Sequence, residues 1–207
     1  MTLEQEMKLV VTSDGPLQLS ELEWLRPYCS AQLVIHHLVS TYFDTPDLHL
    51  ITQGVGLRLR NENGSWLQTV KATGQVKDGF HQREEWEQEL NSANFDLEKL
   101  KQTPLNVMIQ DSEIWPALAP MFTTDFIRQS LQLSLPQETT IELAYDRGQI
   151  RAGELSEPVH EIELELKSGS IEQLKQLARE CCQKLPVVYG DDSKAHRGYR
   201  LVGLARE

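Results

Sequence analysis

Ionic and apolar side chains alternate near the start of the chain. In the stretch "EQEMKLVV", Glu4, Glu6 and Lys8 occupy every second position, and Met7 and Leu9 belong to the opposite set. Successive side chains of a β-strand point to opposite faces of a sheet. The spacing therefore predicts a strand with two carboxylates and one ammonium on one face and apolar side chains on the other.

The same pattern recurs along the chain. Its further ionic or polar members are Arg58 and Arg60, Thr69 and Lys71, Arg83, Glu85, Glu87 and Glu89, Arg128, Asp146, and Glu161, Glu163 and Glu165. The alternate positions hold Leu57, Leu59, Val70, Trp86, Ile162, Leu164 and Leu166. A half-buried sheet usually turns mixed polar residues toward water. Here one face is almost purely ionic, and the other is an apolar face that helices must cover.

Two interpretations of the ionic face follow from elementary electrostatics. Carboxylates two residues apart on a strand lie about 6.6 Å apart and repel by roughly 2.5 kcal/mol at an effective dielectric near 20. On a solvated face, water screens most of that repulsion and the pattern has little meaning. In an enclosed cavity the carboxylates need cations and the arginines need anions. Oxygen-only clusters suit Mg²⁺ or Mn²⁺, and Arg and Lys suit phosphoryl oxygens, so the second interpretation is a metal and polyphosphate site.

Mostly strands must position these side chains. Period-two segments are 3–11, 34–44, 55–62, 65–72, 80–90, 124–134, 139–151 and 159–167. Asn63-Gly64 predicts a tight hairpin, and "DRGQ" at 146–149 predicts another turn, so consecutive strands should be antiparallel neighbours. Ser20 to Glu23 has capping-box spacing before a helix that Pro27 should end early. We expect short helical turns in 96–122, a helix after Ser170 with Cys181 in its apolar stripe, and a last helix in "SKAHRGYRLVGL".

Composition limits the class of protein. The chain has 207 residues, 40% of them hydrophobic, which suits one domain, and a net charge of −11, which argues against nucleic acid and anionic membranes as partners. No apolar run approaches the roughly 18 residues that span a bilayer, and the acidic start is unlike a leader peptide. Three cysteines, two of them adjacent, give no disulfide framework. We therefore expect a cytoplasmic location.

The ordered motifs resemble the CYTH superfamily, also called the triphosphate tunnel metalloenzymes. The resemblance rests on Glu4-x-Glu6-x-Lys8, that family's signature, followed in order by "YFDTPD", "GLRLR", "TVK", "HQREE", "TDFIR", "EIELEL" and "SKAHRGY". It covers essentially the whole chain, 1–207, as one CYTH domain. The resemblance implies an α+β fold: a closed eight-stranded antiparallel β-barrel that forms a tunnel, with a polar interior and helices packed outside.

The resemblance also implies roles for individual residues. It implies a divalent cation, Mg²⁺ or Mn²⁺, held by Glu4, Glu6, Asp146, Glu161, Glu163 and Glu165. It implies that phosphoryl oxygens are bound by Lys8, Arg58, Arg60, Lys71, Arg83, Arg128 and Lys194. The residues nearest the reaction would be Glu4, Glu6, Lys8 and Glu163. The register leaves open which two of the last three glutamates bind metal, and Glu85 is placed to orient an arginine. Tyr42 lies at a position near substrate in some relatives, although a strand tyrosine is usually a packing residue.

The resemblance is greatest to bacterial inorganic triphosphatases, in which a helical CHAD domain often follows. This chain holds no CHAD domain, so we expect a stand-alone form or a truncated one. The implied activity is hydrolysis of inorganic triphosphate to pyrophosphate and phosphate, with a small polyphosphate as the partner. Thiamine triphosphatase, adenylate cyclase and a non-catalytic polyphosphate-binding module are the alternatives. The sequence does not indicate the general base, the oligomeric state or the physiological role.

Overall fold

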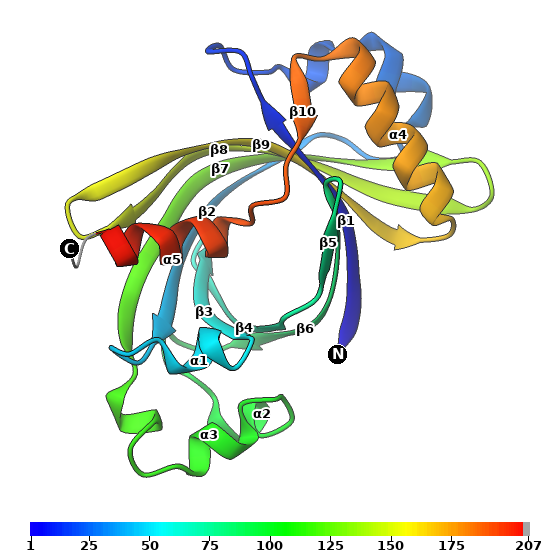
Figure 1. The fold of residues 1–207 in the computed structure, drawn as a ribbon. Helices are drawn as coiled ribbons and strands as arrows, with labels where there is room; N and C mark the ends of the chain where they lie inside the picture. Colours follow the sequence, from blue (N-terminus) through cyan, green and yellow to red (C-terminus); the bar gives the residue numbers. More distant parts are fainter. Residues whose placement is uncertain (205–207) are drawn as a thin grey trace.

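The computed structural model describes residues 1–204, and a closed barrel of eight antiparallel strands dominates it (Figure 1). The strands are β1 (Thr2–Val11), β2 (Val34–Asp44), β3 (Val55–Glu62), β4 (Ser65–Ala72), β6 (Phe80–Leu90), β7 (Ala119–Leu135), β8 (Thr139–Ala152) and β9 (Leu155–Ser168). They follow one another around the barrel in the order β1-β9-β8-β7-β2-β3-β4-β6, and pairing of β1 with β6 closes it. Closure leaves these eight strands without a free edge. The predicted fold class is confirmed.

The predicted strands agree with the observed ones in place and type, and β7 and β9 are longer than expected. Asn63 (φ 50°) and Gly64 (φ 98°) form the predicted hairpin turn. The predicted turn at 146–149 is wrong, because β8 runs straight through it. Gly148 lies in that strand opposite Phe126, where a Cβ atom would be 2.4 Å from the Phe126 Cα atom. This glycine therefore serves close strand packing rather than a turn.

Two short strands were not predicted. β5 (Gln75–Lys77) pairs with β6, and β10 (Val187–Tyr189) pairs with the outer half of β1. Three residues are too few to show a period of two. β10 lies beside β1 and β5 lies beside β6, and both extend the sheet beyond the closed barrel (Figure 1).

The two main helices lie where they were predicted. The helical elements are α1 (His49–Thr52), α2 (Leu97–Leu100), α3 (Asn106–Gln110), α4 (Ile171–Lys184) and α5 (Lys194–Leu204), with 3₁₀ turns at Leu19–Glu21, Glu23–Tyr28 and Trp115–Ala117. The capping box at Ser20 is wrong: Ser20 lies inside the first 3₁₀ turn, and Pro27 lies inside the second. The missing amide of proline suits this short, irregular structure better than an α-helix. No helix within residues 1–204 has the length and apolar character that crossing a membrane requires.

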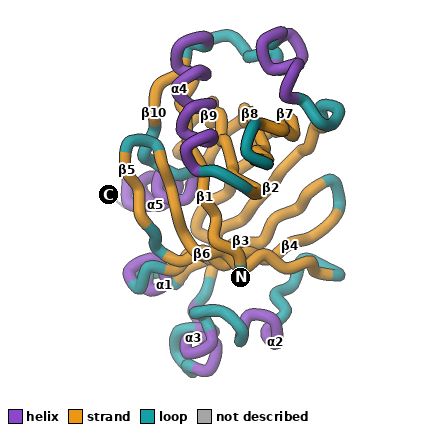
Figure 2. The backbone as a smooth tube through the Cα atoms, turned by 90° about the vertical axis from the view of Figure 1, so that its right-hand side faces the viewer, coloured by secondary structure: helices purple, strands orange, loops and turns teal. Residues whose placement is uncertain are grey.

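The outer face of the barrel carries the main cores. α4 buries Leu174, Leu177 and Cys181 against β1 and β9, which contribute Met7 and Leu164. A second core forms where the segment of α2 and α3 packs on the opposite side of the barrel, below it in Figure 1 and again in Figure 2. These helices cover the apolar face that the alternation predicted.

One end of the inner face is apolar, which the sequence pattern did not show. Phe122, Ile150 and Val159 continue the inward positions of β7, β8 and β9, and they pack against Tyr199 and neighbouring residues of α5. α5 crosses this end of the barrel in Figure 1. The helix therefore packs on the inner face, whereas α4 packs on the outer face.

Candidate active site: an ionic tunnel

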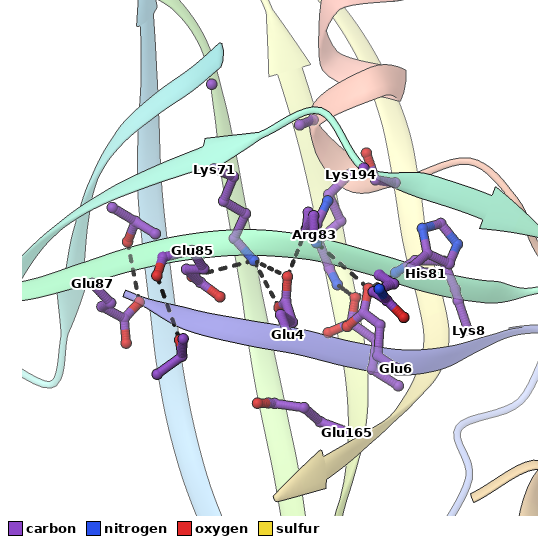
Figure 3. A pocket seen from close by; sticks show the side chains of 18 of the residues that line it. Glu4, Glu6, Lys8, Lys71, His81, Arg83, Glu85, Glu87, Glu165 and Lys194 are labelled. Atoms are coloured by element: carbon purple, nitrogen blue, oxygen red, sulfur yellow. Dashed lines mark hydrogen bonds and ion pairs between the residues drawn. The ribbon is translucent and has the colours of Figure 1, made fainter. Parts of the chain in front are cut away.

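A cavity of about 920 Å³ occupies the barrel, and its wall contains most of the predicted site residues. Those residues are Glu4, Glu6, Lys8, Arg58, Arg60, Lys71, Arg83, Arg128, Glu163, Glu165 and Lys194. Figure 3 shows several of them converging from β1, β4, β6 and α5. The ionic side chains thus face an enclosed space rather than bulk water.

Three carboxylates gather at one side of the barrel; Glu163 lines the cavity, whereas Asp146 and Glu161 are not among the residues that line it. Each of Asp146, Glu161 and Glu163 offers an oxygen atom, and these atoms lie within 4.8 Å of one another. Asp146 and Glu161 are almost fully buried, with 0% and 1% of their surface exposed. β8 and β9 bring them together, because Asp146 lies directly opposite Glu161 and Glu163 is two residues further along β9. We refer to these three residues as the acidic cluster.

Lys194, Arg128 and Lys8 each pair with more than one carboxylate of the acidic cluster. The Lys194 ammonium lies 2.6 Å from Asp146 Oδ2, 2.5 Å from Glu161 Oε1 and 3.0 Å from Glu163 Oε1. Arg128 donates to both oxygens of Asp146 at 2.7 Å and to Glu163 at 2.6 Å. Lys8 donates to Glu161 at 2.8 Å and also to Glu163. Without such partners, three carboxylates this close together, two of them buried, would not all ionise.

The protonation of the acidic cluster follows from these contacts. Burial alone would raise the pKa values of Asp146 and Glu163, but Arg128 and Lys194 hold that of Asp146 below its ordinary value. Lys194, Lys8 and Arg128 hold the pKa of Glu163 well below its ordinary value. Burial would likewise lower the pKa of Lys8, and Glu161 and Glu163 raise it instead. Asp146, Glu163 and Lys8 are therefore charged at neutral pH.

Glu6 differs from these carboxylates. Its side chain is buried, and its Oε1 atom accepts no hydrogen bond from the residues that the structure describes; Arg83 Nη2 is 3.5 Å away. Burial, with Glu163 and Glu4 nearby, raises the pKa of Glu6 to about 7. An orphaned buried oxygen next to other carboxylates is a position where a cation would be stabilised.

Glu4 lies apart from the acidic cluster. Lys71 donates to its two oxygens at 2.9 and 3.1 Å, and Arg83 donates to Oε2 at 2.6 Å (Figure 3). Burial would raise the pKa of Glu4, but Lys71 and Arg83 hold it well below its ordinary value. Strand β1 thus places Glu6 between the acidic cluster and Glu4, and Glu4 against the cations of β4 and β6.

Glu165 also lies outside the acidic cluster. It lines the cavity, pairs with Lys167 at 2.6 Å and keeps about a third of its side chain exposed. Burial raises its pKa, which Lys167 partly offsets. Of the three glutamates of β9 that the sequence left unresolved, the structure brings Glu161 and Glu163 into the cluster.

The opposite wall is basic. Arg58 lies 3.3 Å from Glu87, 3.6 Å from Glu85 and 3.5 Å from the Tyr42 hydroxyl. Arg60 donates to Ser40 Oγ at 3.1 Å and has no carboxylate within 4 Å among residues 1–204. Burial, with Arg58 and Arg128 nearby, lowers the pKa of Arg60 to about 10. A half-buried cation without a carboxylate partner indicates a position for an anionic ligand.

The sequence analysis did not identify Arg197 and Ser40 as parts of the site. Arg197 donates to Glu161 at 3.0 Å and to Glu157 at 2.6 Å. It lies three residues after Lys194 in a helix, and that spacing, which puts both on one face, could have found it. Ser40 alternates with His36 and Tyr42 on β2, so its inward direction was readable, but a lone serine carries no sign of anion binding.

The donor set fits a hard divalent cation. Its members would be the carboxylates of the acidic cluster together with Glu6, all oxygen donors, and the ammonium and guanidinium groups between them occupy positions that favour positive charge. Neither thiol nor imidazole belongs to this cluster. The chemistry of the donors therefore suits Mg²⁺ or Mn²⁺ better than zinc or copper.

The closed barrel and the ionic tunnel inside it define a class of protein. Comparison with known sequences identifies the same class. The CYTH domain family matches residues 2–199, so the chain belongs to the CYTH family. A curated relative, an inorganic triphosphatase of Haemophilus influenzae, is 33% identical over 212 residues; the match covers 97% of this chain and 55% of that protein. The chain therefore spans about half the length of that relative.

Solved structures agree on the fold. The Hippeastrum protein HpAC1, a proposed adenylyl cyclase with a dominant triphosphatase activity, has a TM-score of 0.56 at 19% identity, over 94% of this chain and 95% of that one. A proposed adenylate cyclase of Bacillus halodurans has a TM-score of 0.54 at 18% identity, over 95% and 98%. At this level of identity the likeness shows the fold alone.

Proposed function

We propose that the chain hydrolyses inorganic triphosphate to pyrophosphate and phosphate, with a divalent cation held on the acidic side of the tunnel. The observation that carries this proposal is the separation of charge across the barrel: on one side a cluster of three carboxylates, of which Glu163 lines the cavity, and on the other the half-buried Arg60 with no carboxylate within 4 Å among residues 1–204. The curated relative of 33% identity supports the same activity.

The cationic residues of the proposal bind the phosphate chain. Triphosphate is a dense polyanion that repels an incoming water molecule, and charge moves to the leaving group as the P–O bond breaks. Arg58, Arg60 and Lys71 neutralise the phosphoryl oxygens of triphosphate that lie against the basic wall, and Arg83 lies beside these residues. Lys8, Arg128 and Lys194 lie at the junction with the acidic cluster, where the reacting phosphoryl group meets both walls.

The acidic residues of the proposal hold Mg²⁺ or Mn²⁺. Asp146, Glu161, Glu163 and Glu6 form the inner part of this set, and Glu4 and Glu165 extend it along β1 and β9. Such a cation, when bound, neutralises phosphoryl oxygens and lowers the pKa of a coordinated water molecule. Glu4 also holds Lys71 and Arg83 in place for the substrate, through the three hydrogen bonds described above.

A substrate panel tests the activity. Phosphate release is measured from inorganic triphosphate, tetrapolyphosphate, long-chain polyphosphate, thiamine triphosphate and ATP, each with Mg²⁺, Mn²⁺ or EDTA. We expect triphosphate with a divalent cation to give the highest kcat/KM, and EDTA to abolish release. Preference for thiamine triphosphate, formation of a cyclic nucleotide from ATP, or binding of polyphosphate without release would each overturn the proposal in favour of one alternative.

A further inference from the structure

Helix α5 delivers two cations to the acidic cluster from outside the barrel strands. Lys194, the first residue of α5, reaches all three carboxylates, and Arg197 reaches Glu161. A lysine at a helix N-terminus is unfavourable to the helix dipole, so its placement is explained by the cluster and not by the helix. Hydrogen bonds of 2.5 to 3.0 Å form only if α5 lies at one particular distance from the barrel.

A glycine controls how closely α5 approaches. Gly198 lies in the middle of α5, where glycine is less favourable than alanine. A Cβ atom at this position would be 2.1 Å from Cε2 and 2.3 Å from Cδ2 of Phe122, far inside contact distance. Any other residue would push the helix away or displace the ring.

The Phe122 ring is fixed on two further sides. It stacks on Tyr42 with the ring centres 4.4 Å apart and the planes 13° apart, and it meets Tyr199 of α5 edge-on at 5.1 Å. It is 3% exposed. Moving the Phe122 ring would therefore disrupt these two contacts. A side chain at position 198 would displace α5 instead.

The same aromatic stack ends at the basic wall. The Tyr42 hydroxyl lies 3.5 Å from Arg58 Nη1, while Lys194 also lies over the Phe126 ring at 4.9 Å. A continuous line of contacts thus joins Arg58, Tyr42, Phe122 and Gly198.

We propose that Gly198 and Phe122 are positioning residues whose contact sets the depth at which α5 docks and so holds Lys194 on the acidic cluster during the reaction. The proposal rests on the function proposed above, because its effect on rate is an effect on triphosphate hydrolysis. Neither residue touches the reacting atoms; both act through Lys194.

Two glycines of α5 provide a matched pair of variants. Gly198→Ala and Gly203→Ala gain the same helix propensity, but Gly203 is exposed and an added methyl group there would have no neighbour within 4 Å, whereas at Gly198 it meets Phe122. We expect Gly203→Ala to keep the wild-type kcat and Gly198→Ala to lose at least tenfold in kcat. Equal kcat values in the two variants would overturn the proposal.

A second pair of variants separates positioning from loss of stability. Phe122→Leu in the Gly198→Ala background removes the ring that the new methyl group meets, so kcat should recover by at least threefold over Gly198→Ala alone. In a Lys194→Ala background, Gly198→Ala should lower kcat by less than a further twofold, since both changes act through one ammonium. Absence of recovery, or losses that multiply, would show a merely structural role.

Amide hydrogen exchange gives a readout that needs no substrate. In Gly198→Ala, exchange should rise at least tenfold in α5 residues 194–204 and stay unchanged in β8 and β9. Gly203→Ala should show no such rise, and protection of α5 in both variants would contradict the docking role. If the wild-type protein releases no phosphate from triphosphate, the proposed function fails, and this exchange comparison still decides whether Gly198 and Phe122 set the position of α5.

Discussion

At the scale of single residues, carboxylates at alternate positions of the same strand differ in their pKa values. Glu6 and Glu4 are two residues apart on β1, yet the pKa of Glu6 is raised to about 7 and that of Glu4 is held well below its ordinary value. Glu4 has Lys71 and Arg83 as hydrogen-bond donors, whereas Glu6 has an orphaned oxygen. Local partners, and not residue type, therefore decide the charge of each carboxylate.

Glu6→Gln should alter stability in a pH-dependent way. Because the pKa of Glu6 is higher in the folded protein than the ordinary 4.5, its contribution to stability is fully present below pH 4.5 and is lost as the pH rises through about 7. A shift of this size corresponds to about 3 kcal/mol. Glutamine resembles the protonated form, so in EDTA the variant should unfold at a higher temperature than wild type at pH 8.5 and at a similar one at pH 5.

The exposed Glu84 of the neighbouring strand β6 supplies the control for that measurement. Glu84→Gln should leave the unfolding temperature within experimental error of wild type at both pH values. A Glu6→Gln effect of the same sign and size at pH 5 and pH 8.5 would show that the buried carboxylate is not protonated in the folded protein.

Kinetic constants should distinguish the two walls. Arg58→Ala removes a cation that we propose binds phosphoryl oxygens before and during the reaction. We therefore expect KM for triphosphate to rise about tenfold or more, since a charged hydrogen bond contributes roughly 1.5–3 kcal/mol. Glu6→Gln removes a proposed cation ligand, so we expect kcat to fall about a hundredfold with a smaller change in KM. Unchanged turnover in Glu6→Gln would refute its place on the acidic side.

At the scale of elements, the strands carry the site through alternation, and close packing of their backbones preserves the register. Gly148 illustrates this point, because it lies within β8 two residues after Asp146, and a Cβ atom there would be 2.1 Å from the Asp125 carbonyl oxygen on β7. The atom that blocks it is backbone, which cannot rotate away. The strand pair β7–β8 therefore requires glycine at this position.

Gly148→Ala should destabilise the protein by about 1–3 kcal/mol, the usual range for overpacking. The free energy of unfolding from urea titration measures the change. Gly15→Ala is the control, since Gly15 has a negative φ and no atom within 4 Å of an added Cβ. Equal stability of the two variants would mean that β7 and β8 separate without cost at Gly148.

At the scale of the whole molecule, a net charge of −11 coexists with a cavity rich in Lys and Arg. The barrel collects cations from β1, β3, β4, β6, β7 and α5 around one space, which carboxylates of β1, β6 and β9 also line. The net charge predicts the average electrostatic potential of the outer surface, whereas the charged residues that line the cavity set a separate local potential there. The proposed anionic substrate would therefore meet clustered cations on the basic wall although the molecule as a whole is acidic.

Divalent cations should stabilise the folded chain. A ligand that binds only the folded state raises the unfolding free energy by about 2.7 kcal/mol at a concentration 100-fold above its Kd. Mg²⁺ or Mn²⁺ should therefore raise the unfolding temperature of wild type, and Asp146→Asn should abolish most of this increase. Glu113→Gln, at an exposed position, should retain it. No increase in wild type, or an undiminished one in Asp146→Asn, would contradict a cation site at the acidic cluster.

The sequence by itself determined the strands, their two faces and the ionic character of the inner one. Alternation at Glu4, Glu6 and Lys8 is a local property with a period of two, and it holds whatever the strand pairs with. The Asn63-Gly64 turn was equally local. The false turn at 146–149 shows the limit of such signals, because Gly148 is explained by a neighbouring strand and not by its own backbone.

Only the tertiary structure decided which ionic groups meet. Asp146 joins Glu161 and Glu163 through the register of β8 with β9, Glu4 joins Lys71 and Arg83 through closure of the barrel, and α5 adds Lys194 and Arg197. A shift of one residue in any register would turn those side chains to the other face. Lys8 and Glu161, for example, are 153 positions apart in the sequence. Such contacts depend on strand registers and helix docking that the whole core sets together, and no local pattern in the sequence encodes them.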